Sequence, residues 1–349
     1  MKKQVKEKKL SQSDLILYLH ASAAFQLLNA GVELKLFELL HQKKTQTVPD
    51  IANALKLKLQ SARCLVFGLV ALRLIKNVNN LCQNGSIIER LFNEGEWKLF
   101  KSMVLLQSNI MYIGQIDFVK SLQQSRNVGL QRFAGTGNTL YQRLGQSPKL
   151  QKIFKDFMEV YSEFANPHLL RHINFSQDHF VLDVGGGSGT NAIALAKHYP
   201  NSSVILLDLP GVASVAKKKI EQHGLSDKIK FYPADMFKQQ FPKNQDCVLL
   251  IHQLVIWSSE GNIILLRKAY ESLKKNGRVI IFNSIADDSE NGPLMAALDT
   301  VYFRSIAAGN GMIYPWKDYE KWLHKIGFKR VERIRCKSWT PHGIIVGYK

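Results

Sequence analysis

The spacing of apolar residues predicts a helical first half of the chain. Residues 15–40 carry apolar side chains at helical spacing, with Gly31 as a possible break. A second helix is expected over residues 60–74, and the Thr, Pro and Asp of residues 47–50 before it are typical of a helix start. Residues 74–85 follow as a short hairpin. Helix, turn, helix and β-wing in this order indicate a winged-helix arrangement.

The middle of the chain, from about residue 90 to residue 175, is also expected to be mainly helical, with a loop at residues 134–138. Within residues 150–170 the aromatic side chains fall three, four and three apart along one helix face. They are Phe154, Phe157, Tyr161 and Phe164. Such a stripe either packs into a core or forms one wall of a substrate pocket, and the pattern leaves both possibilities open.

From Phe180 onward the pattern changes to short apolar strands that alternate with helices. This alternation indicates βαβ units and a parallel sheet, with ligands at the carboxyl ends of its strands. The expected strands are residues 180–184, 203–208, 229–234, 246–251 and 278–284, and the expected helices are residues 191–198, 212–223 and 263–274.

Composition excludes several classes of protein. The chain of 349 residues is 46% hydrophobic and 21% charged, which suits a globular protein with a sizeable core. No apolar run approaches the roughly 20 residues of a membrane span, and the charged residues 1–9 are not followed by signal-peptide features. We therefore expect no membrane contact and a cytoplasmic location.

The four cysteines are scattered and form no CxxC pair, which excludes a zinc site or a disulfide framework and fits a reducing compartment. Cys64 and Cys247 lie among apolar residues and are expected to be buried thiols. We expect no bound metal from this pattern.

The formal net charge of +19 invites a nucleic-acid partner, but two features argue against one. The lysines are dispersed, and clusters such as residues 217–219 fit the solvated face of a helix. The expected helix over residues 60–74 is mostly apolar, whereas a recognition helix needs polar side chains that reach base edges. Apolar helices of this kind favour burial against a second subunit.

A glycine-rich turn, Asp183-Val-Gly-Gly-Gly-Ser-Gly189, follows one expected strand and opens a helix. Gly185 and Gly187 allow a tight turn and a close approach of ligand to backbone. In a dinucleotide fold this turn would hold a pyrophosphate. Asp183 would repel a diphosphate, but it could pair with an ammonium group such as the amine of methionine.

The next two expected strands also end in acids. Asp208, followed by Leu209, is placed to accept hydrogen bonds from ribose hydroxyls. Asp235 could bond an exocyclic amine, while Met236 and Phe237 could cover an adenine face. Each acid alone could be a cap, but three consecutive strands that end this way indicate S-adenosyl-L-methionine.

These motifs resemble the family of small-molecule methyltransferases that includes caffeate-type and acetylserotonin-type O-methyltransferases and their bacterial natural-product relatives. The resemblance runs from Leu15 to the C-terminus and includes residues 31–40, 51–55 and 71–75 and the pair Gly327-Phe328. It implies an α/β, Rossmann-like methyltransferase domain behind a mainly helical, winged-helix-like dimerisation domain, and hence a homodimer.

The resemblance implies three parts of the chain: a dimerisation domain at residues 1–100, a helical linker and pocket wall at residues 101–175, and the methyltransferase domain at residues 176–349. It also implies that the cofactor is held by a set of residues at the strand ends. These are Asp183, Gly185, Gly187, Asp208, Leu209, Asp235, Met236, Phe237 and Ile251.

The catalytic segment departs from the family pattern. Family members carry His-Asp-Trp after the fourth strand, and that histidine removes a proton from the substrate hydroxyl, a contribution of about 10²–10⁴-fold. Alignment on Trp257 places Val255 at the base and Ile256 at the aspartate. Alignment on Asp318 places Ile313 where many members have a glutamate that orients the base. The absence of both the histidine and the glutamate indicates that the protein uses different chemistry or does not catalyse the reaction.

Three hypotheses follow from this loss. The enzyme methylates an acidic oxygen or another pre-activated nucleophile by proximity alone. Alternatively it methylates carbon, with His252 as a base or metal ligand, although no second histidine is evident because His324 lies in a helix and His342 near the last strand. In the third, a hydroxylase-like or regulatory dimer binds the cofactor without methylating.

The acceptor site is assigned by position within the family. The expected lining residues are Tyr161, Trp257, Met295, Tyr302, Phe303 and Trp316, with His252 and Asp299 as the catalytic candidates. Asp299 and Tyr302 are three apart and share one helix face. Core packing is the alternative for the tryptophans and Phe303, and a solvated position is the alternative for Asp299. The favoured function is O- or C-methylation of an aromatic or hydrophobic small molecule.

Overall fold

The computed structural model describes residues 10–349, which divide into two compact units after Ser108. The charged residues 1–9 lie outside this described part. Within residues 10–349, no single helix is long and apolar enough to cross a membrane, and only the first two helices, bent by 66°, reach that length and composition as a pair.

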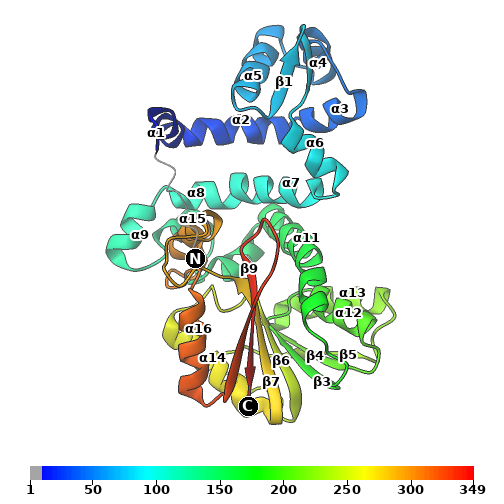
Figure 1. Cartoon of the computed structure of the whole chain (residues 1–349), viewed down its shortest axis with the longest axis vertical. Helices are drawn as coiled ribbons and strands as arrows, with labels where there is room; N and C mark the ends of the chain where they lie inside the picture. Colours follow the sequence, from blue (N-terminus) through cyan, green and yellow to red (C-terminus); the bar gives the residue numbers. More distant parts are fainter. Residues whose placement is uncertain (1–9) are drawn as a thin grey trace, which may run out of the picture. The chain divides into compact units, whose positions relative to one another are not determined.

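The N-terminal unit consists of helices and one hairpin (Figure 1). Thr47 and Asp50 form the capping box of α4, as its sequence predicts. The hairpin turns through Asn79 and Asn80, both in the left-handed region that a two-residue turn requires. The elements are α1 (Gln12–Leu19), α2 (Ala21–Glu33), α3 (Leu36–Lys43), α4 (Val48–Ala54), α5 (Leu59–Ala71), β1 (Ile75–Val78), β2 (Leu81–Asn84), α6 (Ser86–Asn93) and α7 (Trp97–Leu106).

Two details of this unit correct the sequence-based expectations. The helical pattern breaks at His20 and at Leu34–Lys35 rather than at Gly31, which lies inside α2. A Cβ at Gly31 would lie 2.6 Å from the Phe37 ring, so this glycine serves close packing. Cys64 is exposed rather than buried, because its apolar neighbours Leu65 and Leu69 turn the other face of α5 to the core.

The C-terminal unit begins with helices, after a π-helical turn at Gln107–Met111. These are α8 (Tyr112–Gln115), α9 (Phe118–Gln124), α10 (Leu140–Arg143) and α11 (Pro148–His172), joined partly by 3₁₀ turns. The irregular residues 134–138 lie between α9 and α10, as predicted. The aromatic stripe of residues 154–164 lies on α11.

A seven-stranded sheet in the order β5-β4-β3-β6-β7-β9-β8 follows. Its first five members are parallel, and β9 is antiparallel to both β7 and β8. All the predicted strands are present, and β8 was not anticipated. The bounds are β3 (Phe180–Val184), β4 (Ser203–Asp208), β5 (Ile229–Pro233), β6 (Gln245–Ile251), β7 (Leu273–Ser284), β8 (Arg330–Arg335) and β9 (His342–Tyr348).

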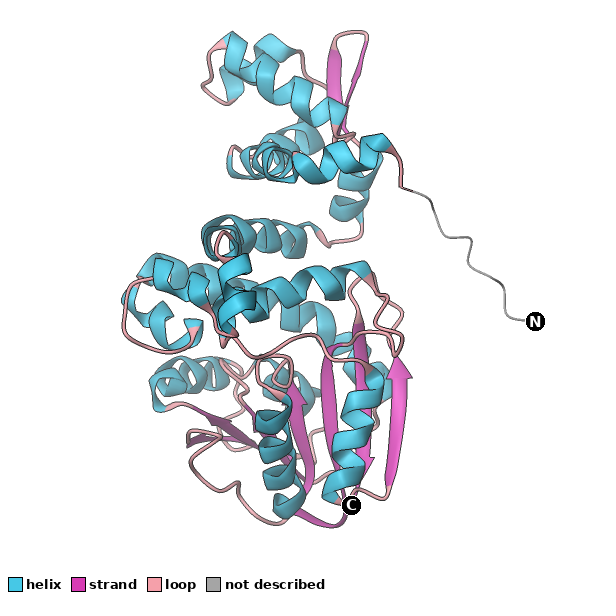
Figure 2. Ribbon diagram, turned by 90° about the vertical axis from the view of Figure 1, so that its left-hand side faces the viewer, coloured by secondary structure: helices cyan, strands magenta, loops and turns pink. Residues whose placement is uncertain are grey.

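Helices cover both faces of this sheet (Figure 1, Figure 2). One core packs α14 (Ser259–Ser272) and α16 (Trp316–Ile326) against the strands, and the other packs α11, α12 (Thr190–His198) and α13 (Ala213–Gln222). A further helix, α15 (Leu294–Tyr302), follows β7. The carboxyl ends of β3 to β7 lie along one edge of the sheet, and the antiparallel register brings the first residue of β9, His342, opposite Ser284 at that same edge.

Candidate active site

The glycine turn connects β3 to α12 in a conformation that needs glycine. Gly185, Gly187 and Gly189 have φ values of 69°, 58° and 83°, which L side chains adopt with strain. A Cβ at Gly185 would lie 2.4 Å from Nε2 of Gln253, whereas the space around Gly187 is open. The turn therefore leaves its backbone open to a ligand at Gly187. At Gly185 it is fixed by a hydrogen bond, in which Gln253 donates to the Gly185 carbonyl at 3.0 Å.

Asp183, near the end of β3, has a buried carboxyl group without a partner in the described chain. It is fully buried, and neither carboxylate oxygen has a hydrogen-bond partner among residues 10–349. Burial, and secondarily the nearby carboxylate of Asp208, raises the pKa of Asp183 to about 7. A buried carboxylate without partners needs an explanation, and a cationic ligand supplies one. The site therefore fits the ammonium group of S-adenosyl-L-methionine.

Asp208 ends β4 and ties the second strand to the glycine turn. Its Oδ2 accepts the Gly187 N–H at 2.7 Å, and its Oδ1 accepts the Leu209 N–H at 2.7 Å. A carboxylate oxygen has two acceptor positions, so each still has capacity for a sugar hydroxyl. The side chain is half-buried, and Leu209 beside it is exposed.

The loop after β5 holds the third acid. Asp235 Oδ1 accepts the Phe237 N–H at 2.9 Å, which turns the backbone sharply at this point. Lys268 of α14 donates hydrogen bonds to the carbonyls of Met236 and Phe237 at 2.8 and 2.6 Å. The Phe237 ring meets Trp257 edge to face at 4.8 Å. Met236 and Phe237 are both half-buried, and this loop is thus anchored with its apolar side chains at the strand ends.

The last residue of β6, Ile251, is buried beneath the same edge. Val255 and Ile313, which the sequence analysis aligned with the base and its glutamate, lie farther on and meet in one apolar cluster. Val255 and Ile313 are 4% and 2% exposed, and they pack with Ile256 and Ala296. Phe303, Trp257 and Tyr141 cover this cluster. The positions that the sequence analysis aligned with the base and its glutamate are therefore buried and apolar.

Helix α15, which contributes Ala296 to this cluster, also carries an acid. Asp299 lies one turn beyond Ala296 and is half-buried, and desolvation raises its pKa to about 7. The hydroxyl of Tyr302 on the same helix donates to the hydroxyl of Tyr141 at 3.5 Å. The charge of Asp299 also contributes to the raised pKa of Tyr161, after desolvation as the main cause.

A second histidine lies beside His252, contrary to the expectation that none was near. His252 directly follows β6 with φ of 56°, and its ring centroid lies 5.2 Å from that of His342. Tyr161 packs 5.0 Å from both rings. Sequence spacing concealed this pair because only the β7–β9 register brings position 342 to the strand ends. Within residues 10–349, no group of three or more His, Cys, Asp and Glu side chains could hold a metal ion.

Burial keeps both imidazoles neutral. It lowers the pKa of His252 to about 4, and it lowers that of His342 well below its usual value, with His252 as a secondary cause. The Nε2 atoms of both rings are buried without a hydrogen-bond partner in the described chain. A neutral imidazole keeps one ring nitrogen free to accept a hydrogen bond or a proton.

Of the other predicted lining residues, Met295 is half-buried on α15 and Phe303 lies just beyond it. Trp316 lies elsewhere: it is buried in the core between α16 and the sheet, where a Cβ on Gly343 would lie 2.3 Å from its ring. The structure thus packs Tyr161 against His252 and brings Val255, Trp257 and Phe303 together in the apolar cluster.

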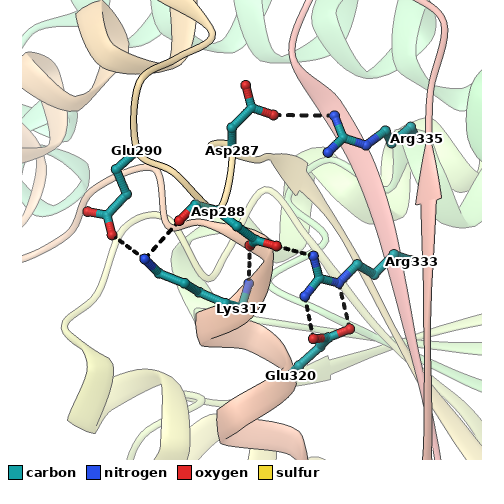
Figure 3. A network of polar contacts seen from close by, with 7 residues as sticks. All are labelled: Asp287, Asp288, Glu290, Lys317, Glu320, Arg333 and Arg335. Atoms are coloured by element: carbon teal, nitrogen blue, oxygen red, sulfur yellow. Dashed lines mark hydrogen bonds and ion pairs between the residues drawn. The ribbon is translucent and has the colours of Figure 1, made fainter. Parts of the chain in front are cut away.

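A network of charges fixes the segment that leads from β7 into α15 (Figure 3). Arg333 of β8 pairs with Glu320 of α16 and with Asp288 of the segment. Lys317 Nζ lies 2.6 Å from Glu290, and its backbone N–H donates to Asp288 at 2.7 Å. Arg335 pairs with Asp287 at 3.3 Å. The entrance to α15 is therefore attached to α16 and β8 by ion pairs.

Comparison with known proteins agrees with this geometry. The O-methyltransferase domain model matches residues 117–329, and the O-methyltransferase dimerisation domain model matches residues 16–94. The L-tyrosine C(3)-methyltransferase of Streptomyces lavendulae is 42% identical over 342 residues, which cover 97% of this chain and 93% of that protein. Acetylserotonin O-methyltransferase of Bos taurus is 23% identical over 325 residues, 92% of each chain.

Solved structures share the fold. The S-adenosylmethionine-dependent methyltransferase SibL in its apo form superposes with a TM-score of 0.86 at 42% identity, over 97% of this chain and 99% of that one. Human N-acetylserotonin methyltransferase in complex with S-adenosylmethionine gives a TM-score of 0.83 at 20% identity, over 99% of each chain.

The fold and the acid-ended strands define an S-adenosylmethionine-dependent methyltransferase that acts on a small molecule. The chain belongs to the O-methyltransferase family, with a helical dimerisation domain followed by a Rossmann-like α/β domain. These matches favour a methyltransferase over a homologue that binds the cofactor without methylating.

Proposed function

We propose that this enzyme methylates a ring carbon beside the hydroxyl of a phenolic, tyrosine-like small molecule. The observation that carries the proposal is the apolar cluster of Val255 and Ile313 at the family's base position. A phenolate can attack a methyl group through oxygen or through the neighbouring ring carbon. A valine in place of the base offers no polar contact to an oxygen at this position and suits a ring edge instead. The 42% identity to an L-tyrosine C(3)-methyltransferase supports the same chemistry.

In this proposal the phenolic proton goes to Asp299. Its carboxyl group, with a pKa raised to about 7, is half ionised near neutral pH and can both take and return a proton. Tyr161, Trp257, Met295, Tyr302 and Phe303 line the acceptor site, and Trp316 supports it from the core.

The donor site is proposed residue by residue. When bound, S-adenosyl-L-methionine supplies the electrophilic methyl group. Asp183 would hold its ammonium group, Asp208 its ribose, and Asp235 the exocyclic amine of the adenine. Gly185, Gly187 and Leu209 would line the turn, while Met236, Phe237 and Ile251 would contact the adenine and the tail. The orphaned carboxylate of Asp183 supports this assignment most directly.

We also propose that the enzyme is a cytoplasmic homodimer without a nucleic-acid partner, with the three parts bounded at residues 1–100, 101–175 and 176–349. Large apolar side chains exposed on the N-terminal unit support a subunit interface there. They include Leu15, Ile16, Tyr18, Leu19 and Phe67. Light scattering after size exclusion should give twice the chain mass, and a monomer would contradict this. Tight, sequence-specific gel shifts would contradict the absence of a nucleic-acid partner.

The test of function is incubation of the enzyme with S-adenosyl-L-methionine and L-tyrosine, followed by assignment of the methyl position by NMR. We expect methylation at the ring carbon next to the hydroxyl. A methyl ether as product, from tyrosine or from related phenols, would overturn the proposal.

A further inference from the structure

The histidine pair beside Tyr161 continues into a chain of hydroxyl groups. His342 Nδ1 lies 2.7 Å from Thr340 Oγ1, which lies 2.8 Å from Ser338 Oγ. The Thr340 N–H donates to Ser338 Oγ at 3.3 Å, so the three residues have a fixed geometry. Thr340 is 1% exposed, whereas Ser338 is only half-buried. The chain thus runs from the buried imidazoles towards the surface.

At its inner end the chain reaches the acceptor side of the site. His252 is half-buried, although its Nε2 is buried without a partner in the described chain. His342, 3% exposed, stands behind it with its own Nε2 unpartnered. With 5.2 Å between ring centroids, the N–H of one imidazole can reach the Nε2 of the other after a small rotation. His252 is therefore the ring that a ligand can touch, and His342 is the ring that connects it to Thr340.

Methylation of a ring carbon must release a proton from carbon, whereas methylation of oxygen releases only the phenolic proton. As the carbon–methyl bond forms and the sulfur–methyl bond breaks, the sulfur keeps the bonding pair. The ring carbon then carries both the methyl group and its hydrogen, and the ring is no longer aromatic. Aromaticity returns when that C–H bond breaks and its electron pair enters the ring. The released proton needs an acceptor and a route out of a buried site.

We propose that His252, His342, Thr340 and Ser338 form the relay that removes this ring proton. Nδ1 of His252 accepts it while Nε2 gives up its own proton to Nε2 of His342. Nδ1 of His342 passes a proton to the Thr340 hydroxyl, which passes one to Ser338 and solvent. Asp299 meanwhile returns the phenolic proton to the oxygen, so that one proton leaves for each methyl group transferred. His252 is the catalytic residue of the relay, and the others act through it.

A weak base suffices for this step. The low pKa values of the two imidazoles keep them unprotonated at neutral pH, and regained aromaticity drives the proton onto them. The phenolic proton is held more tightly than the ring proton of the methylated, non-aromatic ring. It is therefore assigned to Asp299, which has the higher pKa. The inference rests on the proposed carbon methylation.

The experiment compares turnover of L-tyrosine with that of L-tyrosine deuterated at the ring carbons next to the hydroxyl. We expect methyl transfer to limit the rate of the unaltered enzyme, which gives a kcat ratio close to one. Thr340→Val keeps the shape of the side chain and removes the relay hydroxyl. We expect this variant to show a lower kcat, a primary isotope effect clearly above one, and an unchanged KM for both substrates. His342→Gln should behave in the same way.

Thr340→Ser is the matched control, because it keeps the hydroxyl and should restore a ratio near one. If Thr340→Val does not fold, Ser338→Ala at the half-buried end of the relay replaces it, with the same expected isotope effect. Ring-methylated product with no isotope effect in the hydroxyl variants would overturn the relay alone. A methyl ether from the unaltered enzyme would overturn the proposed function. It would also overturn the relay, because no ring proton is then released.

Discussion

The two halves of the strand edge differ in how their polar groups are arranged. On the proposed donor half, at the ends of β3, β4 and β5, each acid lies within two residues of the end of its strand, and the glycine turn bonds to the second acid. On the proposed acceptor half, at the ends of β6 and β7 and the start of β9, the polar groups come from separate elements, including α11 and α15. The donor half is thus a local motif, and the acceptor half is a product of tertiary folding.

The halves also differ in charge. The donor half contains a fully buried, unpaired carboxylate that suits a cation, while the acceptor half contains neutral imidazoles and an apolar surface. This contrast indicates that the donor enters as a charged ligand with fixed partners. In the proposed acceptor site, burial raises the pKa of one acid, Asp299, to about 7. Four substitutions test this contrast.

The largest effect is expected from Asp183→Asn. The change removes the partner of the donor's ammonium group and should weaken cofactor binding on the order of 10²-fold or more, as loss of a buried charge partner does. Isothermal titration with S-adenosyl-L-methionine measures it. Asp227→Asn, on an exposed loop, is the control and should bind normally. Equal affinities in the two variants would remove Asp183 from the donor site.

The next effect is expected from Asp299→Asn, which should lower kcat by about 10²-fold while leaving donor affinity unchanged. In the unaltered enzyme the protonated carboxyl cannot accept the phenolic proton. The rate should therefore rise with pH through about 7. The variant should lose this rise. Asp227→Asn, on an exposed loop, is again the control. A variant that retains the full pH profile would show that another group titrates.

A smaller effect is expected from the double substitution Val255→His and Ile313→Glu, which restores both positions of the family's proton relay. Part of the product should become the methyl ether, because a base now faces an oxygen beside the methyl group. Mass spectrometry and NMR of the products measure the ratio. Val255→Leu with Ile313→Leu keeps the surface apolar and should give ring methylation alone. If the double variant gives the same products, positions 255 and 313 do not determine which atom is methylated.

The smallest effect concerns stability without cofactor. The folded-state pKa of Asp183 is raised, so its ionised form destabilises the fold, and this penalty grows as pH rises from about 4 to about 7. At pH 8, Asp183→Asn should therefore melt a few degrees higher than the unaltered protein, which corresponds to about 1–2 kcal/mol. At pH 4 the two proteins should have the same melting temperature. Calorimetry without ligand measures this. A lower melting temperature at pH 8 would mean that the carboxylate has a stabilising partner.

The same contrast explains what sequence could predict. The three acids and the glycine turn were identified because each lies at a strand end that apolar runs mark clearly. His342 was not connected to His252, because their proximity depends on antiparallel pairing between β7 and β9, which no local pattern specifies. Strand β8 was missed because Arg330–Arg335 is half-exposed and mostly charged, so its apolar signal is weak.

Two further differences have local causes. Gly31 resembled a helix break, yet the chain uses the left-handed Lys35 for that purpose and reserves the glycine for contact with Phe37. Apolar neighbours in sequence predicted a buried Cys64, but on a helix such neighbours point in different directions. The sequence pattern predicted most helices and strands. It did not predict the direction of individual side chains or the long-range pairing of strands.

The ion pairs at the entrance of α15 have a consequence for how the proposed acceptor side can vary. They fix the segment that leads into the helix, while Ala296 packs the helix itself into the apolar cluster. None of these contacts involves the strand ends that carry Asp183, Asp208 and Asp235. Residues of α15 can therefore change without disturbing the proposed donor site.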